Sequence, residues 1–186
     1  MTATVRRSNT PDKAWRMGMW LTIAASCMMF TGLTSAYVVS QGLGPPWEQL
    51  EIRPLAGMNS LILLLSSGTM EYARRRARRE LGVPRSLLVT LGLGLLFVAG
   101  QLALFRQLGN EGFYLNTGRQ TSFFYVLTSL HGLHVVAGII GLAFVAGRMQ
   151  SRGAGDPRRQ LRLDIVTLFW HFMGCLWIWI MVVLFV

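Results

Sequence analysis

The chain has 186 residues, of which 52% are hydrophobic and only 14% are charged, and its mean hydropathy is +0.43. In soluble domains about a quarter of the residues are charged. The composition therefore excludes an ordinary soluble fold and indicates a helical membrane protein with short loops. A net charge of +10 would suggest nucleic acid in a soluble protein. Here the basic residues collect between apolar runs, so we expect no nucleic-acid partner.

Five apolar runs follow one another, each long enough to cross a bilayer, which takes about 20 residues. We predict one transmembrane domain over residues 1–186, an all-α bundle of five transmembrane helices that begins with a mobile basic tail at residues 1–12. A signal peptide is not expected, because the first apolar run is too long and no small-residue cleavage site ends it. The predicted helices cover about residues 14–39, 55–73, 86–105, 121–147 and 163–186.

The first predicted helix holds Gly32 and Ala36 one turn apart, a pair of small residues that lets a neighbouring helix approach closely. It also holds Cys27, and the last helix holds Cys175. Because both cysteines lie inside apolar runs, we expect them to be buried small residues and not a disulfide.

The second and third predicted helices carry polar residues at membrane depth. Serine and threonine can bond back to their own helix, but Asn59 needs another helix or water. Gln101 is the one strongly polar residue of the third helix. Glu71 and Asp164 fall at helix ends, so the spans contain no carboxylate and a proton-coupled transporter is disfavoured.

The fourth predicted helix contains His131 and His134, three residues apart on one face, and the fifth contains His171. Two histidines one turn apart cannot be opposite axial ligands of one haem, and a zinc site needs further ligands. A bis-histidine haem that joins the fourth helix to His171 stays open. The simpler expectation is a hydrogen bond from each imidazole to a carbonyl, a hydroxyl or a lipid.

The basic residues also predict the topology. They cluster before the first helix, between the second and third, and between the fourth and fifth, whereas only Arg53, Arg106 and Arg119 fall on the other side. By the positive-inside rule the N-terminus is cytoplasmic and the C-terminus is outside.

Several of these segments resemble subunit III of the haem-copper oxidases, the cytochrome c and quinol oxidases. SFFYVLTSLHGLHVVAG (122–138) is similar to the signature helix of that family. Further segments agree in order and spacing: MGMWLTIAASCMMFTGLTSAY (17–37), NSLILLLSSGTM (59–70) and FWHFMGCLWIWIMVVLFV (169–186). Gln101 falls where the family has a glutamine. The form resembled is the short five-helix bacterial one, which lacks two extra N-terminal helices.

The resemblance implies a non-catalytic subunit of a respiratory terminal oxidase in the bacterial cytoplasmic (inner) membrane. The complex reduces oxygen to water and pumps protons, with haem and copper in the partner subunits and no cofactor in this chain. The implied partners are subunit I as the main contact, subunits II and IV, and phospholipid held in a cleft between helices. The electron donor, the identity of the lipid and membership of a respiratory supercomplex stay open.

No catalytic or metal-binding residue is implied. The structural or lipid-cleft candidates are His131, His134, His171, Trp170, Asn59, Gln101 and Ser26. The family commonly has acidic residues at the positions of Ser26, Leu104 and Gly174, and their absence here weakens a proton-handling role. Two alternatives remain: the related subunit of a nitric oxide reductase complex, and a small bis-histidine haem cytochrome that oxidises quinol.

Overall fold

The computed structural model describes residues 10–42, 53–79, 85–113, 118–152 and 158–185. These residues form five α-helices and, within the described ranges, no strand. The helices are α1 (Thr10–Gly42), α2 (Arg53–Ala77), α3 (Arg85–Asn110), α4 (Arg119–Arg152) and α5 (Arg159–Phe185). The expectation of an all-α chain with five helices is confirmed.

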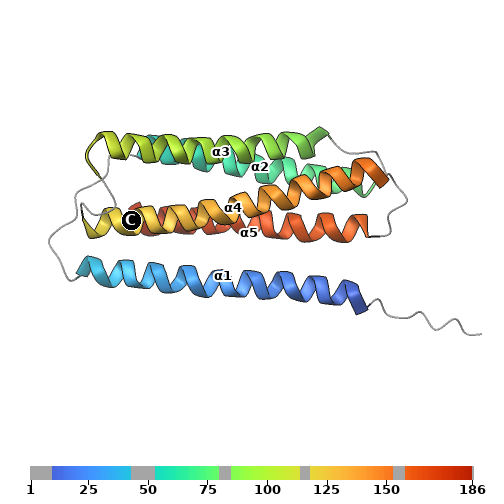
Figure 1. Ribbon diagram of the computed structural model, residues 1–186, viewed down its shortest axis with the longest axis horizontal. Coiled ribbons are helices and arrows are strands. Elements are labelled where there is room, and N and C mark those ends of the chain that lie inside the picture. The colour runs from blue at the N-terminus through green and yellow to red at the C-terminus, as the bar shows by residue number, and fades with distance from the viewer. Residues whose placement is uncertain (1–9, 43–52, 80–84, 114–117, 153–157, 186) are drawn as a thin grey trace, which may run out of the picture.

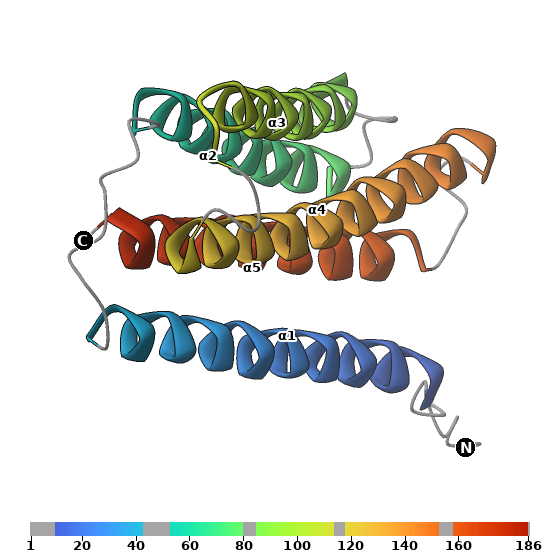
Figure 2. The ribbon, with the colours of Figure 1, turned by 60° about the vertical axis from the view of Figure 1, so that its left-hand side comes forward.

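The five helices lie side by side in three layers (Figure 1). α2 and α3 pack closely together and form one layer, and α4 and α5 form the next. α1 lies alone on the far side of that second layer, where it contacts α4 and α5 (Figure 2). α4 and α5 are the central helices, because α4 contacts α1, α3 and α5, and α5 contacts α1, α2 and α4.

Each outer helix turns one narrow face inward. The buried residues of α3 recur every three or four positions, and those of α4 follow the same spacing. This is the 3.5-residue repeat of helices that pack nearly parallel over their whole length. The buried positions of α3 are Leu87, Thr90, Gly94, Phe97, Gln101, Leu104 and Leu108.

The helices extend beyond the apolar runs of the sequence. α4 continues past Arg148 to Arg152, and α2 continues through three arginines to Ala77. A helix satisfies its own backbone hydrogen bonds, so it can leave the apolar layer without a break. We expected a mobile tail at residues 1–12. Residues 1–9 lie outside the described residues, and residues 10–12 belong to α1.

Four of the five helices, α1, α3, α4 and α5, are long and apolar enough to cross a membrane. The chain is thus suited to be a multi-pass membrane protein. We had expected five apolar spans, and α2 does not meet that expectation. Its centre holds Asn59, Ser60 and Ser66, which lower its hydropathy, yet it lies alongside the other helices in the same bundle.

Two expectations about helix packing are wrong. Cys27 and Cys175 are both exposed on this chain, where we expected burial. Gly32 has no neighbouring atom within 4 Å of the position of a β-carbon, so no described helix approaches it closely. Cys27, Cys175 and Gly32 all lie on helix faces that point away from the bundle. An apolar residue on such a face can contact lipid or another subunit as readily as it would contact a core.

Candidate functional site

The candidate residues do not form one pocket but lie at several helix contacts. Asn59, Gln101, His131 and Trp170 are buried among α2, α3, α4 and α5. Ser26 is buried on α1 and donates a hydrogen bond from its hydroxyl to the Thr22 carbonyl of the same helix, at 2.9 Å. His134 and His171 are half-buried.

His131 is fully buried among aromatic side chains. Its ring centroid lies 5.0 Å from that of Trp177 on α5 and 5.8 Å from that of Phe97 on α3. Neither ring nitrogen has a hydrogen-bond partner among the described residues. For His131, no carbonyl or hydroxyl of the described residues is the hydrogen-bond partner that we expected.

His134 has different neighbours, although it lies less than one turn away. Its Nδ1 atom is 2.7 Å from the Leu130 carbonyl oxygen of the preceding turn. Its ring meets the edge of Phe30 on α1, with centroids 5.6 Å apart. The two histidines of α4 therefore serve two contacts, His131 toward α3 and α5 and His134 toward α1.

His171 belongs to a charged cluster that joins α2 to α5. Its Nε2 atom lies 3.8 Å from a carboxylate oxygen of Glu71. Arg74 pairs with Glu71 at 2.8 Å and with Asp164 of α5 at 3.4 Å. Glu71 lies beyond the apolar stretch of α2, and hydrogen bonds from Arg74, and after it from Arg75, lower its pKa from 4.5 to about 2, against an opposing effect of burial.

Two contacts that the sequence did not reveal fasten α5 to α2. The Trp170 indole N–H donates to the Ser66 hydroxyl at 3.1 Å, and the Trp177 indole N–H donates to the Ser60 hydroxyl at 2.9 Å. The two tryptophans are seven residues apart, so they lie on the same face of α5. The two serines are six residues apart and lie about 120° apart around α2, so only the structure shows that both reach an indole of α5.

The three histidines have three different sets of neighbours. Among the described residues, no group of three or more histidine, cysteine, aspartate or glutamate side chains comes together as a set that could hold a metal ion. The residues available do not supply the three or four converging ligands that a zinc site needs. What the arrangement does is hold helices together.

The chain is similar in sequence to known proteins along most of its length. Residues 2–186 match the model of a protein family described as "Cytochrome c oxidase subunit III". The chain is 32% identical to cytochrome bo(3) ubiquinol oxidase subunit 3 of Pseudomonas putida, over 91% of this chain and 84% of that protein. It is also 32% identical to cytochrome c oxidase subunit 3 of Synechocystis sp., over 87% and 70% of the two chains. Quinol oxidase subunit 3 of Bacillus spizizenii shows the same identity over 88% and 82%. Matched along nearly its whole length, the chain belongs to the cytochrome c oxidase subunit III family.

Proposed function

We propose that this chain is the third subunit of a respiratory terminal oxidase and that its own role is structural. The observation that carries the proposal is the family match over residues 2–186. The interior supports it, because buried polar groups such as Trp170 and Ser66 bond helix to helix. The complex reduces oxygen to water and pumps protons with haem and copper in its other subunits, while this chain holds the catalytic subunit in a stable assembly.

The same proposal places the chain in the bacterial cytoplasmic membrane with its N-terminus inside. The start of α1, the end of α2, the start of α3, the end of α4 and the start of α5 all lie at one end of the bundle (Figure 1). Most of the basic residues lie near that end, as the positive-inside rule requires of a cytoplasmic side. Ion pairs join the helices there, Arg78 to Asp164 at 3.1 Å and Arg158 to Asp12 at 3.8 Å.

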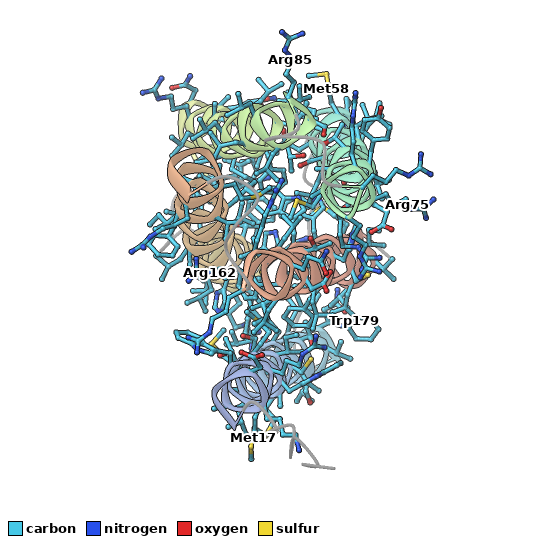
Figure 3. All side chains as sticks on the ribbon, turned by 90° about the vertical axis from the view of Figure 1, so that its right-hand side faces the viewer. Met17, Met58, Arg75, Arg85, Arg162 and Trp179 are labelled. Carbon is cyan, nitrogen blue, oxygen red and sulfur yellow. The ribbon has the colours of Figure 1, made fainter. Side chains whose placement is uncertain are left out.

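The partners in this proposal are subunit I as the main contact, subunits II and IV, and phospholipid. Side chains on the outer faces support it: Met17, Met58 and Trp179 point away from the bundle (Figure 3), and all three are exposed and apolar. A lipid site is supported by a groove between α1, α4 and α5. Its walls include Trp15 and Phe144, and Arg162 lines it as well, a combination that suits an acyl chain with an anionic headgroup.

The test is a gentle-detergent purification of the tagged chain from its own membranes, with mass spectrometry of the partners and an absorbance spectrum. We expect a large haem-copper subunit to co-purify, with haem only in that partner. The His134→Ala variant should retain this haem and lose only modest stability, because His134 bonds to its own helix.

Two results would contradict the proposal. Recovery of the chain alone with a stoichiometric b-type spectrum would make it a small cytochrome. Recovery of the catalytic subunit of a nitric oxide reductase would move the chain to that related complex. An untagged strain, carried through the same steps, controls for adventitious capture.

A further inference from the structure

Three polar side chains in the membrane interior of this bundle have atoms without hydrogen-bond partners. They are Asn59 on α2, Gln101 on α3 and His131 on α4, and they are 3%, 5% and 0% exposed. The amide nitrogen of Asn59, both amide atoms of Gln101 and both ring nitrogens of His131 have no partner among the described residues. We call these three side chains the buried polar layer.

The first two members lie against the same short stretch of α3. The Asn59 side chain packs onto the backbone at Gly100 so closely that a β-carbon there would collide with the Asn59 amide oxygen. Gln101 is the next residue along α3 and belongs to its buried face. Asn59 and Gln101 therefore lie at the same depth in the bundle.

A series of contacts brings His131 to this depth as well. Phe97, one turn before Gln101 on α3, meets the His131 ring. His131 stacks at a tilt on Trp177, and Trp177 donates to the hydroxyl of Ser60, the residue after Asn59. These contacts link α3 to α4, α4 to α5, and α5 to α2 at one level of the bundle. The buried polar layer lies at that level, between these four helices.

The chemistry of the unpartnered atoms defines what could satisfy them. The amide nitrogens can only donate, the Gln101 carbonyl oxygen can only accept, and a neutral imidazole has one nitrogen of each kind. Leaving such groups buried without a partner destabilises the folded chain, because their hydrogen bonds to water are lost and not replaced. A ligand must both donate and accept, and it must be small enough to sit inside a packed bundle. Water meets both requirements, and a buried water typically makes about three hydrogen bonds to groups of this kind.

We propose that the chain binds ordered water at the buried polar layer, bridged between Asn59, Gln101 and His131. The water links α2, α3 and α4 at the level where the Trp177 indole of α5 is bonded to Ser60 of α2. All of the residues involved lie inside this chain. The proposal is therefore independent of which oxidase, or which other complex, the chain joins.

The first test is an electron cryo-microscopy map of the purified complex, at a resolution that shows ordered water elsewhere in its interior. The expected result is a density peak within hydrogen-bonding distance of at least two of the three side chains. A map in which Asn59, Gln101 and His131 bond directly to one another, with no such peak, would overturn the proposal.

The second test measures coupling by thermal unfolding in detergent. Gln101→Leu and His131→Phe should each lower the unfolding midpoint, and the double variant should unfold no lower than the worse single variant, because either change already releases the shared water. The control pairs His131→Phe with Thr90→Val on α3, whose hydroxyl lies 2.8 Å from that of Thr69 at another level. Those shifts should add. Additive shifts for Gln101 and His131 would count against a shared ligand.

Discussion

The indole groups of α5 make bonds that a phenylalanine could not make. Trp170 and Trp177 are 2% and 1% exposed, and each donates its one N–H to a serine of α2. In a membrane the helices gain little from burying apolar surface against one another, so packing and interhelical hydrogen bonds provide much of the attraction. The Trp170 indole also packs against two glycines, since it would contact a β-carbon at Gly94 or Gly138.

Trp170→Phe should lower the free energy of unfolding by about 1–3 kcal/mol, because it removes the bond to Ser66 and leaves a small cavity. Trp179→Phe is the matched control on the same helix. Trp179 is 51% exposed and points outward (Figure 3), so its change should stay within about 0.5 kcal/mol. Equal effects of the two changes on unfolding in detergent would contradict a special role for the indole bond.

Some properties of single residues were within reach of the sequence and others were not. The need of Asn59 for a group outside its own helix follows from its polarity alone, and its burial agrees with that need. The exposure of Cys27 could not be foreseen, because lipid-facing and core-facing positions in a membrane helix are both apolar. The lack of a protein partner for His131 was also beyond reach, since it depends on α3 and α5 supplying aromatic rings around the imidazole.

At the scale of helix pairs, α2 and α3 form the most extensive contact of the bundle. Gly100 permits it, because the Asn59 side chain occupies the space that a larger residue would fill. Nearer the arginine-rich end of the bundle the Thr69 and Thr90 hydroxyls lie 2.8 Å apart. One small residue and one pair of hydroxyls thus set both the distance and the register of the two helices.

Gly100→Ala should destabilise the protein by about 1–3 kcal/mol, because the new methyl group forces Asn59 to move in a packed interior. Gly92→Ala on the same helix is the control. It has no neighbour within 4 Å, and alanine favours a helix over glycine, so stability should stay equal or rise slightly. Thermal unfolding of both variants checks this, and a neutral Gly100→Ala would show that α2 and α3 can separate without loss.

The sequence predicted the helices better than it predicted their partners. Apolar runs placed all five helices, but the charged extensions of α2 and α4 lie outside those runs and were missed. The three positions where the family commonly has acidic residues are an example of what the sequence did not predict. Ser26 and Leu104 are buried, and a side chain at Gly174 would meet the Ser67 hydroxyl at 3.2 Å. Only the fold shows that all three positions face the interior.

At the scale of the whole molecule, the proposed orientation predicts where each connection lies. Alkaline phosphatase fused after Arg79, two residues beyond the end of α2, should be inactive, because the enzyme folds only outside the cytoplasm. The same fusion after Phe113, beyond α3, should be active. Enzyme activity in intact cells, corrected for the amount of fusion protein, measures both, and the opposite pattern would place the N-terminus outside.

The isolation of α1 has a consequence for how the chain is made. The Tyr37 hydroxyl of α1 donates to the Leu184 carbonyl of α5, 147 positions later, and α1 packs against α4 and α5. α1 is synthesised before both of these neighbours, whereas α2 and α3 are consecutive and can pair as soon as α3 is made. α1 therefore reaches its native packing only after α4 and α5 have been synthesised, well after α2 and α3 can pair.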